Sequence, residues 1–253
     1  MKVHVLFKKE DLEKEQLQEG NKTAVVIDVL LATTTITAAL MDGAKSVIPV
    51  FTCDEGKNLA AAYQEKEVVL AGEVHAKSIK GFEYPSPLHL RTKIKGKTLI
   101  LSTTNGTIAL KNAAAAKHVH IACLLNNSAV AQAVKHYGNQ QTVLVVCAGN
   151  SGEVSLEDVY GAGHFIECLT AAERADAVEL TDAAKTAWKL YRGQSEESYK
   201  ILSLSKVGKL FAQYDVREEL EFASRKNISS LVPVLQDGQV KQANIRRSQH
   251  ETG

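Results

Sequence analysis

Carboxylate and hydroxyl side chains gather around one apolar run near the start of this sequence. Asp28 lies in the run 23–30, and Thr33, Thr34 and Thr35 open the helix expected after it. A carboxylate in an apolar strand is costly unless it is paired or coordinated. Mg²⁺ prefers such oxygen ligands and often binds one or two carboxylates together with a phosphate. The threonines could hold that anion at a helix start, although an N-cap and a hydrogen-bonded aspartate explain the same residues.

A second hydroxyl-rich segment follows the apolar run 96–103. Its candidate substrate-binding residues are Thr103, Thr104, Asn105, Gly106 and Thr107. Backbone N–H groups at such a strand-to-helix junction can converge on an anion, and the helix dipole favours negative charge there. The segment lacks the Gly-Lys-Ser/Thr of a P-loop. An Asn-Gly turn with an N-cap is the alternative interpretation.

A third segment, 147–158, combines glycines with two adjacent acids. Gly149 allows a tight turn or a close approach of the backbone to substrate, so it is a candidate binding residue. Ser155 and Asp158 have the spacing of a capping box, which would bond Asp158 back to the Ser155 backbone. Asp158 is also a candidate metal ligand. Glu157 has no capping role, and we expect it to face the metal or the substrate as a catalytic group.

Glu73 follows the apolar run 67–72 and has the same topological position as Asp28. We therefore predict that Asp28, Glu73 and Asp158 are the Mg²⁺ ligands. Asp28 and Glu157 are the predicted catalytic groups.

Strand-like and helix-like patterns alternate through the first two-thirds of the chain. Strands are expected at 3–7, 23–30, 46–51, 67–72, 96–103, 118–124 and 142–149, with helices at 32–43, 54–66, 107–117, 127–138 and 155–171. This alternation predicts an α/β fold with three α/β/α layers and a mainly parallel sheet. Right-handed crossovers place the strand-to-helix loops at one sheet edge, where ligands bind.

The pattern changes near residue 175. Helices are expected at 180–193, 199–214 and 217–226, and a hairpin at 229–240 that turns at Asp237-Gly238. We divide the chain into an α/β core (1–174), a helical C-terminal subdomain packed on the core (175–240) and a flexible tail (241–253).

Composition excludes several classes of partner. The 253 residues include 30 Lys and Arg against 29 Asp and Glu, a net charge of +1. This balance favours neither nucleic acid nor an acidic membrane surface. No apolar run approaches the length of a membrane span or a signal peptide, and the four cysteines form no CxxC pair. A cytoplasmic protein is expected.

Seven short motifs together resemble the 2-phosphosulfolactate phosphatase family over residues 3–240. They are IDVLLATTTI at 27–36, Gly72-Glu73, Gly81-Phe82, TTNGT at 103–107, CAG at 147–149, SLEDVYGAG at 155–163 and Val232-Pro233. The resemblance implies a Mg²⁺-dependent phosphatase that converts 2-phospho-3-sulfolactate to sulfolactate and phosphate. It also implies an α/β/α fold and a homodimer.

The sequence departs from the family pattern in three places. Leu31 stands where the family has arginine, the segment 81–87 is one residue short, and Ser205-Lys206-Val207-Gly208 replaces Ser-x-His-Gly. Leucine cannot clamp a phosphate or sulfonate as arginine does. Two alternatives therefore stay open: a phosphatase for another small phosphoester, and a non-catalytic anion-binding protein of the same fold. Direct attack by water and a phospho-aspartate on Asp28 are both compatible with the sequence.

Overall fold

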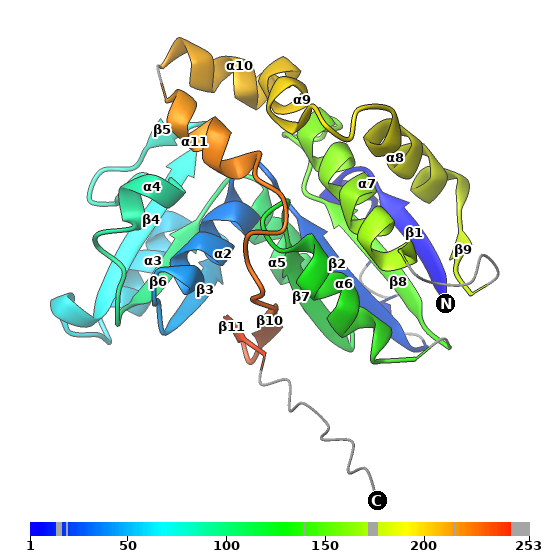
Figure 1. The fold of residues 1–253 in the computed structure, drawn as a ribbon. Helices are drawn as coiled ribbons and strands as arrows, with labels where there is room; N and C mark the ends of the chain where they lie inside the picture. Colours follow the sequence, from blue (N-terminus) through cyan, green and yellow to red (C-terminus); the bar gives the residue numbers. More distant parts are fainter. Residues whose placement is uncertain (14–16, 19, 139, 172–176, 215, 244–253) are drawn as a thin grey trace, which may run out of the picture.

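The computed structural model describes residues 1–13, 17–18, 20–138, 140–171, 177–214 and 216–243. One large sheet runs through this part of the molecule, with helices on both of its faces (Figure 1). The strands are β1 Lys2–Leu6, β2 Lys22–Ile27, β3 Ser46–Val50, β4 Val68–Val74, β5 Lys77–Ser78, β6 Thr98–Ser102, β7 His118–Ala122, β8 Thr142–Cys147, β9 Glu179–Leu180, β10 Pro233–Gln236 and β11 Gln239–Gln242. The predicted α/β class and the mainly parallel sheet are confirmed.

The helices connect successive parallel strands or follow them. The α-helices are α2 Ala32–Met41, α3 Cys53–Ala60, α4 Pro87–Leu90, α5 Gly106–Ala113, α6 Asn127–Lys135, α7 Leu156–Thr170, α8 Asp182–Gly193, α9 Ser198–Leu204, α10 Lys206–Gln213 and α11 Arg217–Ala223, with short 3-10 turns η1 Lys9–Asp11 and η2 Glu65–Glu67. None of the helices in these described ranges is long and apolar enough to cross a membrane.

The C-terminal hairpin lies in the middle of the sheet. The strand order is β5-β4-β6-β3-β11-β10-β7-β2-β8-β1-β9, so the hairpin joins two parallel blocks. Val240 pairs antiparallel with Val47, and Val234 pairs antiparallel with His120. The predicted turn is confirmed, because Asp237 and Gly238 both have positive φ, at 50° and 74°, as a tight hairpin turn requires.

This placement bears on the expected domain limits. Lys241 and Gln242, expected in the tail, belong to β11 and pair with β10. Residues 244–253 of the expected tail lie outside the described residues. The division of the chain into a core and a C-terminal subdomain stays a prediction.

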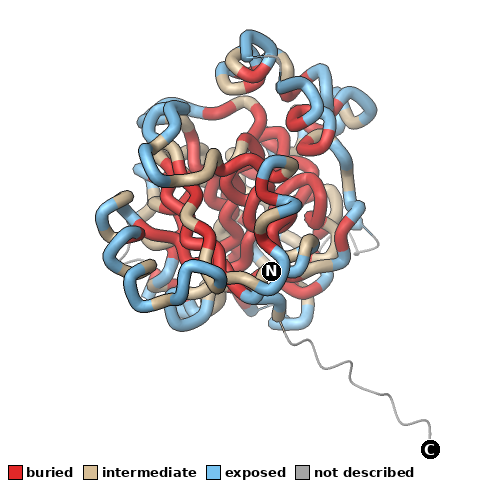
Figure 2. The backbone as a smooth tube through the Cα atoms, turned by 90° about the vertical axis from the view of Figure 1, so that its left-hand side faces the viewer, coloured by how far each residue is buried: buried red, intermediate tan, exposed pale blue. Residues whose placement is uncertain are grey.

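Alternating strand residues fill two separate cores. On β2, Val25 and Ile27 pack with α6, α7 and α8, whereas Ala24 and Val26 pack with α2 and α5. Buried segments therefore run through the centre of the molecule, with exposed segments around them (Figure 2). A sheet covered on both faces explains why its strands read as continuous apolar runs.

The segment predicted as one helix at 199–214 is two helices. Ser205 ends α9 with extended backbone (ψ 164°), and its Oγ accepts a hydrogen bond of 3.0 Å from the Gly208 N–H at the start of α10. Ser205 is therefore the N-cap of α10, although the apolar pattern of residues 199–214 is that of one continuous helix. The break turns α10 across the upper rim of the sheet in Figure 1.

Candidate functional site

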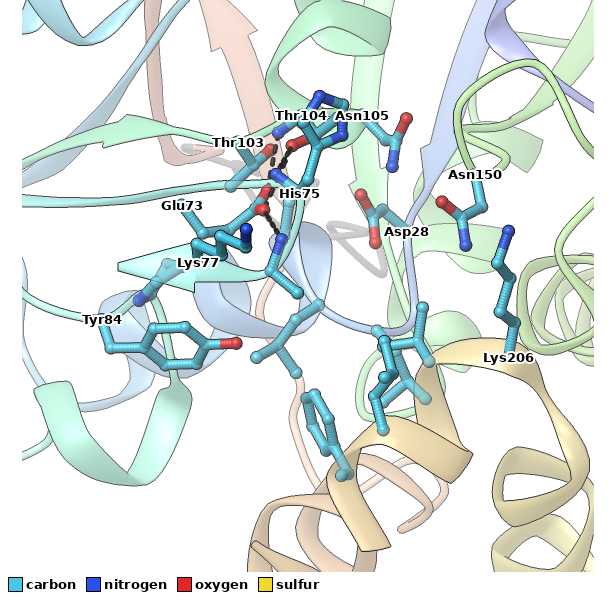
Figure 3. A pocket seen from close by; sticks show the side chains of 18 of the residues that line it. Asp28, Glu73, His75, Lys77, Tyr84, Thr103, Thr104, Asn105, Asn150 and Lys206 are labelled. Carbon is cyan, nitrogen blue, oxygen red and sulfur yellow. Dashed lines mark hydrogen bonds between the residues drawn. The ribbon is translucent and has the colours of Figure 1, made fainter. Parts of the chain in front are cut away.

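A cavity of about 590 Å³ lies at the carboxyl edge of the sheet, between the strand ends and α10. Figure 3 shows Asp28 near its centre, with Asn150 and Lys206 on one side and Glu73 and Tyr84 on the other. Glu73 lies near the end of β4, Lys206 belongs to α10 and the others lie in loops, so the fold brings together segments that are far apart in the sequence. This position is the one expected for ligands of parallel sheets.

Asp28 is the first residue after β2, because the strand ends at Ile27 rather than at Leu30 as predicted. The side chain is only 6% exposed. Burial raises its pKa to about 7, and the negative charges of Glu157 and Glu73 add to the effect. A backbone hydrogen bond from Ala32 opposes this rise. Asp28 is thus a carboxyl group that exchanges its proton near neutral pH.

Gly106 lets the first turn of α5 approach Asp28 closely. A Cβ atom at position 106 would overlap Asp28 Oδ2 and the Cβ of Ala32. Only glycine lacks that atom, so the sequence Asn105-Gly106 has a packing role beyond a turn. The first turn of α5 therefore lies beside the Asp28 carboxylate.

Glu73 ties the end of β4 to the loop after β6 (Figure 3). Its Oε1 accepts a hydrogen bond of 2.7 Å from the Thr104 N–H. Its Oε2 accepts from the Thr104 hydroxyl at 3.1 Å and from the Ala76 N–H at 2.6 Å. The Thr104 hydroxyl in turn accepts from the His75 N–H at 2.9 Å. Glu73 therefore shapes the wall of the cavity.

Asn105 and Lys9 join two further loops to the site. Lys9 Nζ donates to Asn105 Oδ1 at 2.9 Å and forms an ion pair with Glu10 at 2.8 Å. The Ser151 N–H also donates to Asn105 Oδ1, at 3.1 Å. Lys9 is 7% exposed and its charge lowers the pKa of Asp28. The sequence does not single out Lys9, because it lies in a polar run that is typical of an exposed surface.

The loop residues predicted to bind substrate divide into two groups. Thr103, Thr104 and Asn105 line the cavity. Gly106 and Thr107 lie behind them, where the Thr107 N–H donates to Thr103 Oγ1 at 3.1 Å and the Thr103 N–H donates to Thr107 Oγ1 at 3.1 Å. Asn105 occupies the N-cap position of α5, but its side chain makes no capping hydrogen bond. The cap alternative therefore does not explain this asparagine.

Thr33, Thr34 and Thr35 are fully buried and do not line the cavity. The hydroxyls of Thr33 and Thr34 donate to carbonyls of their own loop, those of Asp28 and Val29, both at 2.8 Å. The Thr35 hydroxyl donates to the Pro85 carbonyl at 2.7 Å, which ties the loop to the segment before α4. These bonds hold the turn between β2 and α2 in shape. The three hydroxyls support Asp28 from behind, which differs from the expected contact with substrate.

The predicted capping box at Ser155 is wrong. Ser155 is the N-cap of α7, but its side chain makes no capping bond. Asp158 instead accepts from the Val29 N–H at 2.8 Å and from the Gly149 N–H at 3.0 Å. The carboxylate joins the loops after β2 and β8, because two unpaired backbone donors there need a buried acceptor. Gly149, at φ +68°, serves this junction and does not line the cavity.

Glu157 and Asp158 are both 2% exposed, and neither lines the cavity. Burial raises the pKa of Asp158 well above its ordinary value, and the charges of Asp28 and Glu157 raise it further. Burial also raises the pKa of Glu157, which a side-chain hydrogen bond with Ser205 partly offsets. Glu157 was predicted to face the metal or the substrate, but its side chain does not line the cavity.

The carboxylates around Asp28 have the donor chemistry of a hard-cation site. All are oxygen ligands, and their raised pKa values reflect burial and mutual repulsion, which a cation would relieve. However, in the part of the chain that the structure describes, no group of three or more His, Cys, Asp or Glu side chains is arranged to hold a metal ion. A cation here would bind Asp28 and would need oxygens from water or substrate.

Three basic side chains also line the cavity. Lys206 comes from α10 and pairs with Glu153 at 3.0 Å, while His75 and Lys77 come from the opposite wall. The fold and this site define an α/β protein with a cavity at the carboxyl edge of a parallel sheet, where proteins of this architecture bind ligands.

Comparison with known proteins shows the family. Residues 6–238 match the model of the 2-phosphosulpholactate phosphatase family. The chain therefore belongs to the 2-phosphosulfolactate phosphatase family. It is similar to three proteins named "Probable 2-phosphosulfolactate phosphatase": that of Clostridium acetobutylicum is 36% identical over 95% of this chain and 100% of the relative. The protein of Clostridium perfringens is 37% identical over 95% of this chain and 96% of the relative. The protein of Caldanaerobacter subterraneus is 38% identical over 87% of this chain and 90% of the relative.

Proposed function

We propose that this protein is a Mg²⁺-dependent phosphatase that hydrolyses 2-phospho-3-sulfolactate to sulfolactate and phosphate. The observation that carries the proposal is Asp28, a buried carboxyl group with a pKa of about 7 at the centre of an anion-binding cavity. The names of the relatives support the substrate. Family membership supports phosphate-ester hydrolysis over simple anion binding.

The loop after β6 is the proposed phosphate site. Thr104 and Asn105 face the cavity beside the start of α5, whose N–H groups and dipole favour an anion. Lys206 and Lys77 supply positive charge from opposite walls. These groups hold the phosphate oxygens over Asp28 as negative charge redistributes in the transition state.

Asp28 is the proposed protein ligand of Mg²⁺, and the charges of Glu157 and Glu73 act on it. Asp158, predicted as a further ligand, already accepts two backbone N–H groups. The metal, when bound, neutralises phosphate charge and lowers the barrier to attack at phosphorus. Glu73 was predicted as a further Mg²⁺ ligand, but hydrogen bonds from Thr104 and Ala76 already engage both of its oxygens. Its proposed role is therefore to position the Thr104 loop.

Two routes to hydrolysis fit the position of Asp28. Its carboxylate could attack phosphorus to form a phospho-aspartate, or it could orient a water molecule that attacks directly. Trapping a phosphoenzyme, or retention of configuration at phosphorus, supports the first route. Inversion of configuration supports the second.

Release of phosphate from racemic 2-phospho-3-sulfolactate, with Mg²⁺ and with EDTA, tests the proposal. Asp28→Asn keeps the size of the side chain and removes its charge, so we expect turnover to fall at least about 100-fold in a folded variant. Asp54→Asn is the matched control, because Asp54 is an exposed acid on α3. Full turnover by a folded Asp28→Asn variant would remove Asp28 from the reaction.

A further inference from the structure

One wall of the cavity is apolar. Leu30 and Leu31 follow β2, and Val207, Leu210 and Phe211 face them from α10. Leu30 and Phe211 are buried at 7% and 6% exposure and belong to the main core cluster, against which Leu31 and Val207 also pack. The wall is therefore a fixed continuation of the core.

The anion-binding groups lie elsewhere in the cavity. In Figure 3, the side chains that α10 directs into the cavity lie below Asp28, while Thr104 and Asn105 lie above it. Lys206 stands at the start of α10, beside Asn150. If the phosphate lies at the polar end, beside Thr104 and Asn105, the rest of the substrate contacts the apolar wall.

The cavity is also larger than a three-carbon ester needs. Its volume of about 590 Å³ falls within the range of pockets that hold drug-sized ligands. Tyr214 and Val216, at 73% and 38% exposure, extend the apolar lining towards solvent. Apolar surface of this kind gains free energy when an apolar group displaces water from it. A sulfonate gains nothing from it, because a charged group loses hydration there.

We propose that this cavity also binds phosphomonoesters whose carbon skeleton carries an aliphatic group, with the phosphate beside Asp28 and the aliphatic group against Leu31, Val207 and Leu210. The inference rests on the proposed function and extends its substrate class. The chemistry is the same hydrolysis: water supplies the oxygen that joins phosphorus, the P–O bond to carbon breaks, and the leaving oxygen takes a proton. The products are a 2-hydroxyalkanoate and phosphate.

A series of ligands that differ only in the aliphatic group tests the inference. We would use 2-phosphobutanoate, 2-phosphohexanoate and 2-phosphooctanoate as substrates, and the corresponding phosphonates, which cannot be hydrolysed, for calorimetric binding with Mg²⁺ present. We expect affinity to rise about fourfold per methylene between the butanoate and the hexanoate, the gain for burying one CH₂ group.

Two variants locate the effect. Leu210→Lys places a charge in the apolar wall at a half-buried position, so we expect the gain per methylene to fall to nearly none. Leu204→Lys makes the same change at a residue of α9 that is 53% exposed and does not line the cavity, so the gain should persist. The change of affinity with chain length is read within each variant, so a general change in anion affinity does not obscure it.

The outcomes separate this inference from the proposed function. Wild-type affinity that is flat or falls with chain length overturns the inference, as does an equal gain in Leu210→Lys and wild type. Hydrolysis of phosphosulfolactate beside a flat series leaves the proposed function standing alone. Tighter binding of the longer phosphonates without hydrolysis of any ester supports the apolar site and overturns the proposed function.

Discussion

Asp28 and Gly106 are in such close contact that the start of α5 leaves no room for a Cβ atom beside the Asp28 carboxylate. The contact brings the first turn of α5 next to a buried acid with a pKa of about 7. We therefore expect the proposed phosphate and metal sites to depend on Gly106.

Gly106→Ala should disrupt the site. The added methyl group overlaps Asp28 Oδ2 and Ala32, and overpacking of this kind costs about 1–3 kcal/mol of stability. We expect turnover to fall at least about 10-fold, because Asp28 must shift. Gly193→Ala is the control, since a Cβ there meets nothing within 4 Å. Urea unfolding and phosphate release measure the two effects, and a silent Gly106→Ala variant contradicts the contact.

Lys9→Met should move the acid limb of the pH–activity profile to higher pH. The charge of Lys9 lowers the pKa of Asp28, so its removal raises that pKa further above its ordinary value. Asp28 would then ionise at higher pH, and activity that needs the carboxylate would appear later as pH rises. We expect a shift of about 0.5 unit or more in kcat/KM.

Lys8→Met is the matched control for Lys9, because it removes the same charge from the neighbouring residue, which pairs with Asp11. Its profile should stay at the wild-type position. Equal shifts in both variants would mean that only net charge matters.

The stability of the metal-free protein should fall as pH rises from about 4 to 7. The pKa of Asp28 is raised from 3.8 to about 7, so the folded state holds a proton that the unfolded chain has released in this interval. Folding is then favoured at the acid end and loses that contribution above pH 7. Asp28→Asn should therefore raise the free energy of unfolding at pH 8 by about 2–4 kcal/mol. Urea unfolding in EDTA at pH 5 and 8 measures this, and an unchanged or lower value at pH 8 counts against the buried charge.

Asp158→Asn and Glu157→Gln should differ in stability. Asp158 accepts one backbone N–H on each oxygen, from Val29 and Gly149. An asparagine has one acceptor, so one buried N–H loses its partner at a cost of about 1–3 kcal/mol. Glu157 bonds the Ser205 hydroxyl and its own backbone N–H, and the amide oxygen of a glutamine can still accept such bonds, so the melting temperature of Glu157→Gln should not fall. Thermal unfolding of both variants decides, and a reversed order would assign the structural role to Glu157.

Thr104→Val should weaken substrate binding more than folding. The hydroxyl donates to Glu73 at 3.1 Å and accepts from the His75 N–H at 2.9 Å, within a loop that lines the cavity. Its loss frees the loop, and we expect KM to rise about 10-fold while the core is unaffected. Thr104→Ser keeps the hydroxyl and should restore KM. A variant that only lowers the melting temperature would show a purely structural loop.

The sequence by itself determined the layers and the edge at which the site lies. Continuous apolar runs specify buried parallel strands, and the carboxyl ends of such strands share one edge. Asp28, Glu73 and Thr104 could therefore be assigned to one region, and the structure places all three on the cavity. The turn at Asp237-Gly238 was also readable, because it depends on backbone conformation within the segment.

Only the tertiary structure decided which distant groups meet. The spacing of Ser155 and Asp158 is that of a local cap, yet Asp158 bonds the Val29 N–H, 129 residues away. The sequence of a hairpin likewise does not specify which strands it pairs with. The position of β10 and β11 between β3 and β7 therefore could not be predicted from the sequence. In the sequence Lys9 has the pattern of an exposed surface residue, and only the structure shows its hydrogen bond to Asn105. These contacts depend on desolvation and on unpaired backbone groups, which arise only when separate segments pack together.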